Sequence, residues 1–423
     1  MSRTLDPLLA IFYDACKPRS AERLGVETEK FGILSDGSPL PYEGPSSIVE
    51  MFAQLTEKGW QSVRESDEGP VIALSRDQAS ITLEPGAQFE LSGAPVDNVH
   101  QVCGEISDHL AEIAGPSERL GIRWLTCGYH PTATQDQLPW VPKQRYAIMR
   151  EYFPEVGTRG LDMMRRTATA QVNVDYRSEE DALRKLRLGL KLAPALMGIF
   201  ANSAFAEGKH LGVKCERARV WLDTDPDRTG LLPQLWHDGA GFRDYAEWAL
   251  DAPMYLFKRD GKVVKNTGQT FRNFWQHGWQ QHRATLDDWE MHLGTVFPEA
   301  RLKRTIELRS IDSLPGKFVC AVPALWAGLL YDDASLASAE DLAAPWSYEQ
   351  LQQLRSDAAK DGLAATIDGK PLRHHAEQLV SFARAGLERR QRLNARGKSE
   401  AIFLDSIAKL IEQGLSPADT FTL

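Results

Sequence analysis

The sequence predicts an α+β fold in which a mostly antiparallel sheet carries the functional groups and helices pack outside it. Several short segments alternate polar and apolar residues with a period of two, which is typical of half-buried strands. Longer segments between them repeat apolar residues at helical spacing, and the chain beyond residue 334 is helical and charged. We therefore expect a core over residues 1–334 and a helical C-terminal region over residues 335–423, packed together as one structural unit.

The composition is that of a soluble globular protein, with 43% hydrophobic and 25% charged residues in a chain of 423. The net charge of −9 gives no basic signature for binding nucleic acid or an anionic membrane. The best apolar run, Leu192–Ala201, is far shorter than the ~20 residues that a membrane span requires. Because the five cysteines show no metal-binding spacing, we expect mostly buried thiols and a cytoplasmic location.

Helices are expected where apolar residues recur at helical spacing, and strands where polar and apolar residues alternate. Ser47 and Glu50 form a capping box at one helix start, Gly115 ends another helix, and Pro194 breaks a third. The expected helices cover residues 5–15, 47–59, 95–114, 145–152, 178–206, 242–251, 270–282, 347–360, 373–395 and 400–414. The expected strands cover residues 25–32, 71–74, 80–83, 88–91, 122–127, 170–176, 214–221, 254–257 and 305–309.

The segment from Gly25 to Gly32 is a short strand that places two carboxylates on one face. Side chains alternate between the faces of a strand, so Glu27 and Glu29 point the same way. Like charges side by side repel each other unless water or a cation separates them, and Mg²⁺ prefers oxygen ligands. The pair is therefore either half of a metal site or a solvated pair on an edge strand.

A second stretch, residues 81–91, carries Glu84 before a Pro85-Gly86 break and Glu90 after it. A proline and a glycine inside a strand indicate an edge or a bulge. A bulge can direct both carboxylates toward one point, and the alternative is a half-exposed strand.

A third stretch places Gln171, Asn173 and Asp175 on one strand face, opposite an apolar face. An amide-lined face over a buried face is suited to the floor of a polar pocket. Arg165 and Arg166, directly upstream, are candidates for binding a carboxylate or phosphate through paired N–H donors. The alternative is that both arginines are solvated at the start of the strand.

A fourth stretch puts Glu307 beside Arg309 on one strand face, which suits a site that holds both metal and phosphate. A weak cross-strand ion pair is the alternative. The acidic turn at residues 223–230 does not match a calcium loop, because its glycine comes two places late and no glutamate closes it. We interpret it as a capped turn, with Arg228 as a candidate ligand contact.

The common nucleotide and hydrolase motifs are absent from the sequence. It has no P-loop, no dinucleotide-binding glycine motif after a strand, no nucleophile elbow and no HExxH pair. What remains are carboxylates on distant strands that could converge on several Mg²⁺ ions and hold a nucleoside triphosphate, with arginines stabilising the transferred phosphoryl group. Those carboxylates are Glu27, Glu29, Glu84, Glu90 and Glu307.

The sequence resembles the plant-type glutamate–cysteine ligases in several stretches, which follow in the expected order from about residue 24 to the C-terminus. The stretches are GVETEKFG (25–32), LEPGAQFELSGAP (83–95), GLDMM (160–164), FANS (200–203), DTDPDRTG (223–230), DAPMY (251–255) and GLLYD (328–332). The resemblance implies a glutamine-synthetase-like fold, in which a curved, mostly antiparallel sheet forms an active-site funnel with helices outside.

The resemblance also implies a reaction. ATP and Mg²⁺ would drive the joining of the γ-carboxylate of L-glutamate to the amino group of L-cysteine, through a γ-glutamyl phosphate, as the first step of glutathione biosynthesis. We expect a monomer or homodimer with no nucleic-acid or membrane partner. The alternatives are a related ligase that joins glutamate to another amine, and a catalytically silent regulatory homologue. Loss of a metal carboxylate would indicate the silent homologue, and every expected position here is Glu.

Roles follow by resemblance for the residues described above. The five glutamates would be the metal ligands, and Glu307 with Arg309 would form the catalytic pair that steadies the phosphoryl group. Gln171 and Asn173 would line the floor of the funnel. Arg165 or Arg166 would bind the α-carboxylate of glutamate, and Arg228 remains a substrate-binding candidate.

One departure concerns the cysteine pair that switches activity with redox state in plant members. Cys320 lies where one partner is expected, but residues 270–288 hold no cysteine for the other. We therefore expect this switch to be missing. Cys103, on the apolar stripe of its helix, is expected to be a buried thiol.

Overall fold

A nine-stranded sheet forms the centre of the computed structural model, which describes residues 3–423. The strand order is β14-β15-β7-β1-β5-β4-β3-β2, and β6 pairs with the far end of β1. Every pairing in this sheet is antiparallel, so the predicted α+β class with a mostly antiparallel sheet is confirmed. The strands are β1 (Leu24–Ile33), β2 (Gln61–Arg64), β3 (Val71–Arg76), β4 (Ala79–Leu83), β5 (Phe89–Ser92), β6 (Arg123–Leu125), β7 (Ala170–Val174), β14 (Ala300–Leu302) and β15 (Ile306–Leu308).

The register of the central strands brings the polar residues of the sequence together. β1 pairs with β5 so that Glu29 lies opposite Glu90, and with β7 so that Glu27 lies opposite Gln171. β7 in turn pairs with β15, which places Asn173 opposite Glu307. Directly opposite residues of an antiparallel pair share one face of the sheet. Four strands therefore present their polar side chains on a single face.

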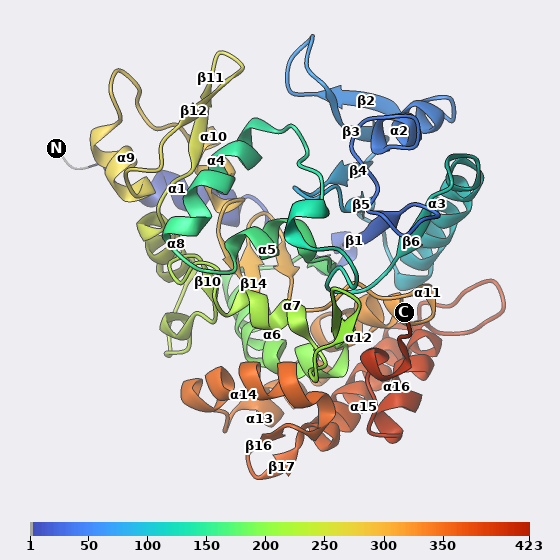
Figure 1. The fold of residues 1–423 in the computed structure, drawn as a ribbon. Coiled ribbons are helices and arrows are strands. Elements are labelled where there is room, and N and C mark those ends of the chain that lie inside the picture. Colours follow the sequence, from blue (N-terminus) through green and yellow to red (C-terminus); the bar gives the residue numbers. More distant parts are fainter. Residues whose placement is uncertain (1–2) are drawn as a thin grey trace.

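Helices surround the sheet on the outside (Figure 1). They are α1 (Asp6–Tyr13), α2 (Ile48–Thr56), α3 (Val99–Leu120), α4 (Gln144–Tyr152), α5 (Gly160–Arg166), α6 (Glu179–Ile199), α7 (Glu216–Trp221), α8 (Phe242–Asp251), α9 (Phe271–His277), α10 (Leu286–Leu293), α11 (Gly316–Val319), α12 (Ala321–Leu330), α13 (Asp333–Ala343), α14 (Tyr348–Asp361), α15 (Leu372–Arg390) and α16 (Asp405–Glu412). Short strand pairs complete the fold: β8 (Phe205–Ala206) with β9 (Lys209–His210), β10 (Thr229–Gly230) with β13 (Phe297–Pro298), β11 (Leu256–Arg259) with β12 (Lys262–Lys265), and β16 (Thr366–Ile367) with β17 (Lys370–Pro371).

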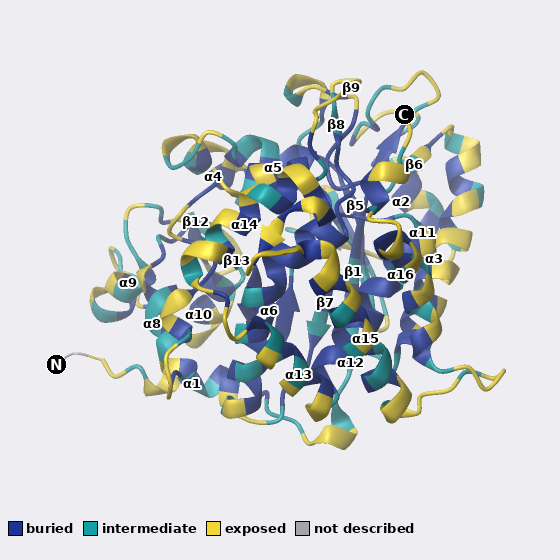
Figure 2. Cartoon of the chain, turned by 90° about the horizontal axis from the view of Figure 1, so that it is seen from below, coloured by how far each residue is buried: buried dark blue, intermediate teal, exposed yellow. Residues whose placement is uncertain are grey.

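The apolar face of the sheet packs on helices that the chain supplies much later. Val172 and Val174 of β7 belong to one hydrophobic core cluster with the buried side of α6 and α12. The C-terminal helices add to this core, because α15 packs on α12 and α14 packs on α6. Figure 2 shows β1 and β7 buried at the centre, with exposed surface on the helices around them. The boundary expected at residue 334 falls in the first turn of α13, and the division into two regions stays a prediction.

Several expected elements differ from the structure. The helix expected to end at Gly115 is α3, which continues through Gly115 to Leu120 and is capped by Gly121 in the left-handed conformation. The segment expected as a strand at residues 214–221 is the short helix α7, because a run this short fits either period and tertiary contacts decide. The long helix α6 continues through Pro194 and ends at Ile199, short of residue 206. Every residue from Leu192 to Ile199 is buried, and this packing outweighs the cost of an interior proline.

A disulfide joins Cys103 of α3 to Cys320, which lies between α11 and α12. The expectation that Cys103 is a free buried thiol is therefore wrong. The stripe that places Cys103 on the inner side of α3 also places it against α12, 5.9 Å from Cys320 between Cα atoms. Cys16, Cys127 and Cys215 are free, and the last two are buried as expected.

A buried histidine makes the stability of this fold sensitive to acid. His292 of α10 bonds through Nε2 to the Ala249 carbonyl oxygen at 2.8 Å, and burial lowers its pKa to about 3. The folded state therefore keeps this ring neutral, whereas the unfolded chain takes up a proton below pH 6.5. The stabilisation is complete above that pH and is lost progressively as the pH falls toward 3.

We expect His292→Gln, which keeps an N–H donor, to remove this sensitivity. The drop in unfolding free energy between pH 7 and pH 5 should become about 2 kcal/mol smaller than in the wild type. Chemical denaturation at both pH values measures the difference, and the exposed His374→Gln is the matched control. An unchanged drop in His292→Gln would contradict the assignment.

Candidate active site

A cavity of about 340 Å³ opens on the polar face of the sheet. It brings together most of the carboxylates and polar groups that the sequence singled out. The predicted residues that line it are Glu27, Glu29, Glu84, Glu90, Gln171 and Arg309. Charged residues that the sequence reasoning missed also line it, namely Lys143, Arg145, Arg217, Arg301 and Lys303. The cavity has an anionic half and a cationic half.

The anionic half is a set of buried and half-buried carboxylates, and we define it as Glu27, Glu29, Glu84 and Glu90. Glu29 and Glu90 are only 6% and 7% exposed. Burial, with Glu84 and Glu90 nearby, raises the pKa of Glu29 well above its usual range. Burial raises the pKa of Glu90 to about 8, with Glu27 and Glu84 adding to the effect. A cation bound between these carboxylates would offset their mutual repulsion and stabilise their charged forms.

The donor chemistry of the anionic half fits Mg²⁺, since every donor is a carboxylate oxygen. In residues 3–423, however, no three His, Cys, Asp or Glu side chains have the spacing to hold a metal ion in their present rotamers. Mutual repulsion keeps the carboxylates apart, and ligation requires them to turn toward a common point.

The loop between β4 and β5 positions Glu84 at this cavity. The Glu84 N–H donates to the Gln88 carbonyl, and Ala87 takes the left-handed conformation with φ of 63°. Gly86 packs directly on the backbone of Arg165, so a Cβ at that position would overlap the Arg165 carbonyl oxygen. The predicted Pro85-Gly86 break is therefore a tight turn held against α5.

Gly86→Ala is expected to displace this turn and Glu84 with it. Overpacking against a backbone atom costs about 1–3 kcal/mol, so the thermal midpoint should fall together with activity. Gly104→Ala, in the middle of α3 with open space around it, is the matched control and should lower neither. Thermal melts and steady-state kinetics measure both effects. Full activity in Gly86→Ala would show that the turn does not position a working group.

The cationic half is organised around Glu307, which is fully buried. Arg301 binds both of its oxygens at 2.7 Å, Lys303 lies at 3.0 Å, and Arg309 also donates to it. Burial alone would raise the pKa of this carboxyl, but Arg301, Lys303 and Arg309 hold it well below its usual range. Cations hold both oxygens of Glu307 in this structure, and metal ligation by Glu307 stays a prediction.

Arg309 extends from β15 to the boundary between the two halves. Its Nη1 donates to the Gln171 side-chain oxygen at 2.6 Å and also to Glu307. Asn173, which does not line the cavity, donates to Glu27 at 2.9 Å. The two predicted amides therefore orient charged side chains on either side of them.

Arg217 is the residue whose role the sequence reasoning most clearly missed. It is 3% exposed, lines the cavity, and its Nη2 donates to the Arg309 carbonyl at 2.7 Å. A strand at 214–221 would have put Arg217 and Arg219 on one face. The helix α7 instead turns Arg219 outward to Glu216 and Arg217 inward.

Three predicted arginines do not line the cavity. Arg165 donates to the Leu138 carbonyl and stacks on Trp140, and Arg166 pairs with Asp162 at 3.5 Å and Glu207 at 3.3 Å. Both belong to α5 rather than to the start of β7, which turns them toward residues 129–140. Arg228 is fully buried, where it pairs with Asp225 at 2.6 Å and donates to backbone carbonyls. Its role in this structure is to hold the acidic turn.

Lys143, the N-cap residue of α4, faces the anionic half. Its Nζ donates to the Leu83 carbonyl at 2.8 Å, beside the Tyr146 hydroxyl. Burial lowers its pKa, while Glu84 and Glu90 oppose that shift. Lys143 thus supplies positive charge to the anionic half from outside the sheet.

Comparison with known proteins gives one consistent result. A model of the glutamate-cysteine ligase family 2 matches residues 23–422. The chain is 42% identical to the chloroplastic glutamate–cysteine ligase of Brassica juncea, over 98% of this chain and 80% of that protein. The corresponding protein of Arabidopsis thaliana is 42% identical, over 98% of this chain and 78% of that protein.

Among solved structures, a glutamate–cysteine ligase of Francisella tularensis in complex with AMP shares the fold. The TM-score is 0.56 at 11% identity, with 94% of this chain and 84% of that chain covered. The relatives also correct one expectation. The predicted cytoplasmic location is contradicted, because the similar ligases of B. juncea, A. thaliana, Medicago truncatula and Oryza sativa are all named as chloroplastic. In residues 3–423, the structure has no helix that is long and apolar enough to cross a membrane.

Proposed function

The chain belongs to the glutamate-cysteine ligase family 2, and from this membership and the divided cavity we propose how its residues carry the reaction. The protein is an ATP-dependent glutamate–cysteine ligase that catalyses the first step of glutathione biosynthesis. The finer chemistry is our proposal: the γ-carboxylate of L-glutamate is activated as a γ-glutamyl phosphate, which the amino group of L-cysteine then attacks. The observation that carries the proposal is the separation of carboxylates and cations within one cavity.

The anionic half would hold Mg²⁺ through Glu29, Glu84 and Glu90, with Glu27 beside them. When bound, Mg²⁺ neutralises the triphosphate and the leaving oxygens. Without a cation these carboxylates repel one another, and burial together with this repulsion raises the pKa values of Glu29 and Glu90. Asn173 keeps Glu27 oriented by its hydrogen bond.

The cationic half would receive the phosphoryl group and glutamate. Arg309 stabilises the charge on the phosphoryl group during transfer, and Glu307 and Gln171 fix its guanidinium before substrate arrives. Arg217 would bind the α-carboxylate of glutamate, since it lines the cavity and Arg165 and Arg166 do not. Arg301 holds Glu307 in position, because its Nε and Nη2 donate to that carboxylate while its Nη1 donates to the Gly294 and Val296 carbonyls.

We also propose a shape for the central sheet. The nine strands would curve around the cavity as the funnel of a glutamine-synthetase-like ligase, with α4, α5 and α7 at its rim. This arrangement is supported by the lining of the cavity, to which those helices and five strands of the sheet contribute. Whether the protein works as a monomer or a homodimer stays a prediction.

The test is ADP release by the purified protein with Mg-ATP and L-glutamate, across a panel of amines that includes L-cysteine. We expect release that depends strongly on cysteine, with γ-glutamylcysteine identified as the product by mass. Release with other amines but not with cysteine would assign the protein to a sister ligase. No release with any amine would indicate a silent homologue.

A further inference from the structure

A second, smaller cavity lies away from the active site, where α15 ends near the start of β1. It has a volume of about 190 Å³, and four arginines line it together with three acidic side chains and Tyr331. The lining residues are Arg19, Arg389, Arg390, Arg392, Glu22, Asp97, Asp332 and Tyr331. We call it the arginine pocket. None of its residues lines the active-site cavity.

The acidic residues of the arginine pocket already have cationic partners. Glu22 lies 3.2 Å from the fully buried Nζ of Lys185, and Asp97 lies 3.0 Å from Arg23. Asp332 accepts two hydrogen bonds from Arg389, at 2.6 and 3.1 Å. Each lining carboxylate is therefore neutralised, and none needs a bound cation.

The arginines are not all neutralised in the same way. Arg19 pairs with Asp333 at 2.5 Å, and Arg389 forms an ion pair with Asp332. Arg390, only 13% exposed, bonds to Glu400 through Nε alone, and its two terminal nitrogens donate to no partner within the described chain. The guanidinium of Arg392 forms no hydrogen bond or ion pair with any residue from 3 to 423. Arg390 thus keeps two terminal nitrogens free beside its ion pair with Glu400, and the charge of Arg392 has no partner in this part of the chain.

We propose that the arginine pocket binds a small dianion through Arg390 and Arg392, with carboxylate or phosphate oxygens as the recognised groups. Guanidinium groups present paired donors that match the oxygens of either group. The volume of about 190 Å³ admits a compact anion. Arg390 also lies over the Tyr331 ring, 5.1 Å from its centroid, which holds the guanidinium plane in place.

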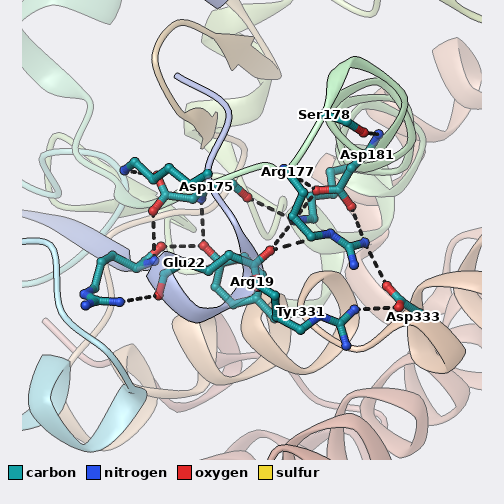
Figure 3. A network of polar contacts seen from close by, with 11 residues as sticks. Arg19, Glu22, Asp175, Arg177, Ser178, Asp181, Tyr331 and Asp333 are labelled. Carbon is teal, nitrogen blue, oxygen red and sulfur yellow. Dashed lines mark hydrogen bonds and ion pairs between the residues drawn. The ribbon is translucent and has the colours of Figure 1, made fainter. Parts of the chain in front are cut away.

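Tyr331 connects this pocket to the strands of the active site. Its hydroxyl accepts from the Asp175 N–H at 2.7 Å, directly after β7, and donates to the Arg23 carbonyl just before β1. Figure 3 shows Glu22, Asp175, Tyr331 and the Arg19–Asp333 pair within one polar network. An anion held against Tyr331 is therefore expected to stabilise this end of the β1–β7 pair and raise the thermal midpoint.

Calorimetric titration with inorganic phosphate and, separately, with succinate tests the proposal at constant ionic strength. The exposed Arg392→Gln has no contact to lose in the folded protein, so it should fold normally, and Arg390→Gln is the second variant. We expect each variant to weaken binding about tenfold, since each removes charge-assisted hydrogen bonds to the anion. Arg396→Gln, an exposed arginine of the same loop that does not line the pocket, should leave binding unchanged.

The active-site variant Arg309→Gln separates the two cavities, because released phosphate also fits the active site. Binding that persists in Arg309→Gln and weakens in Arg390→Gln and Arg392→Gln supports the proposal. The probe that binds more tightly, phosphate or succinate, then shows whether the pocket recognises phosphate or carboxylate oxygens. Binding that is lost only in Arg309→Gln would assign the anion to the active site and overturn the proposal. If neither phosphate nor succinate binds, the proposal is also overturned.

Discussion

Glu90→Gln is expected to lower kcat by about a thousandfold while leaving the fold intact. It removes one charge from the anionic half, and metal stabilisation of the transferring phosphoryl group is worth several kcal/mol, at about 1.4 kcal/mol for each tenfold in rate. The pKa of Glu90 is already raised to about 8 by burial, Glu27 and Glu84. In the metal-free protein at neutral pH this carboxyl is therefore already largely protonated, so a neutral amide of the same size costs little and the thermal midpoint should not fall.

A large loss of kcat with an unchanged thermal midpoint distinguishes a metal ligand from a carboxylate that only stabilises the fold. Glu105→Gln is the matched control, since Glu105 is a partly buried carboxylate outside the cavity that accepts a hydrogen bond from the Ala94 N–H. Its kcat should remain at the wild-type value. Steady-state kinetics and thermal melts of both variants give the comparison. A Glu90→Gln enzyme with normal kcat would remove Glu90 from the metal site.

Arg309→Lys is expected to lower kcat by about a hundredfold with a smaller effect on the KM for glutamate. Arg309 reaches Gln171 and Glu307 at once through its guanidinium, and a lysine replaces this fork with a point charge. An interaction that matters in the transition state is lost from kcat more than from KM. The loss of one such donor is worth about 10²–10³ in kcat in other active sites.

The control for this substitution is Arg304→Lys. Arg304 lies near the same edge of the sheet, but it is exposed and bound to Glu290 on the surface. Its kcat should be unaffected, because surface pairs contribute little. Equal kcat values for Arg309→Lys and the wild type would exclude a transition-state role for Arg309.

Strand periodicity was sufficient to predict the carboxylates of the cavity. Glu27 and Glu29 share one face of β1, and the register with β5 and β7 brings Glu90 and Gln171 to the same face. Because side chains alternate along a strand with a period of two, the sequence alone tells which residues share a face, even when the neighbouring strands are unknown. The positions of these residues could therefore be predicted although their neighbours lie far apart in the sequence.

The arginines could not be predicted in the same way. Arg165 and Arg166 lie on a helix that ends just before β7, and Arg217 lies on a helix of six residues. One residue of helix rotates a side chain by about 100°, so the assignment of a short segment decides whether its arginine enters the cavity. The Cys103–Cys320 bond spans 217 residues and depends on the packing of α3 on α12. Sequence spacing alone carries no signal for that contact.

Mn²⁺ binding, followed by electron paramagnetic resonance, tests the metal site most directly, because Mn²⁺ is a spectroscopic substitute for Mg²⁺. We expect the wild type to bind Mn²⁺ together with ATP, Glu90→Gln to bind it at least about tenfold more weakly, and Arg309→Lys to bind it normally. Equal Mn²⁺ binding by the wild type and Glu90→Gln would contradict the assignment of the anionic half as the metal site.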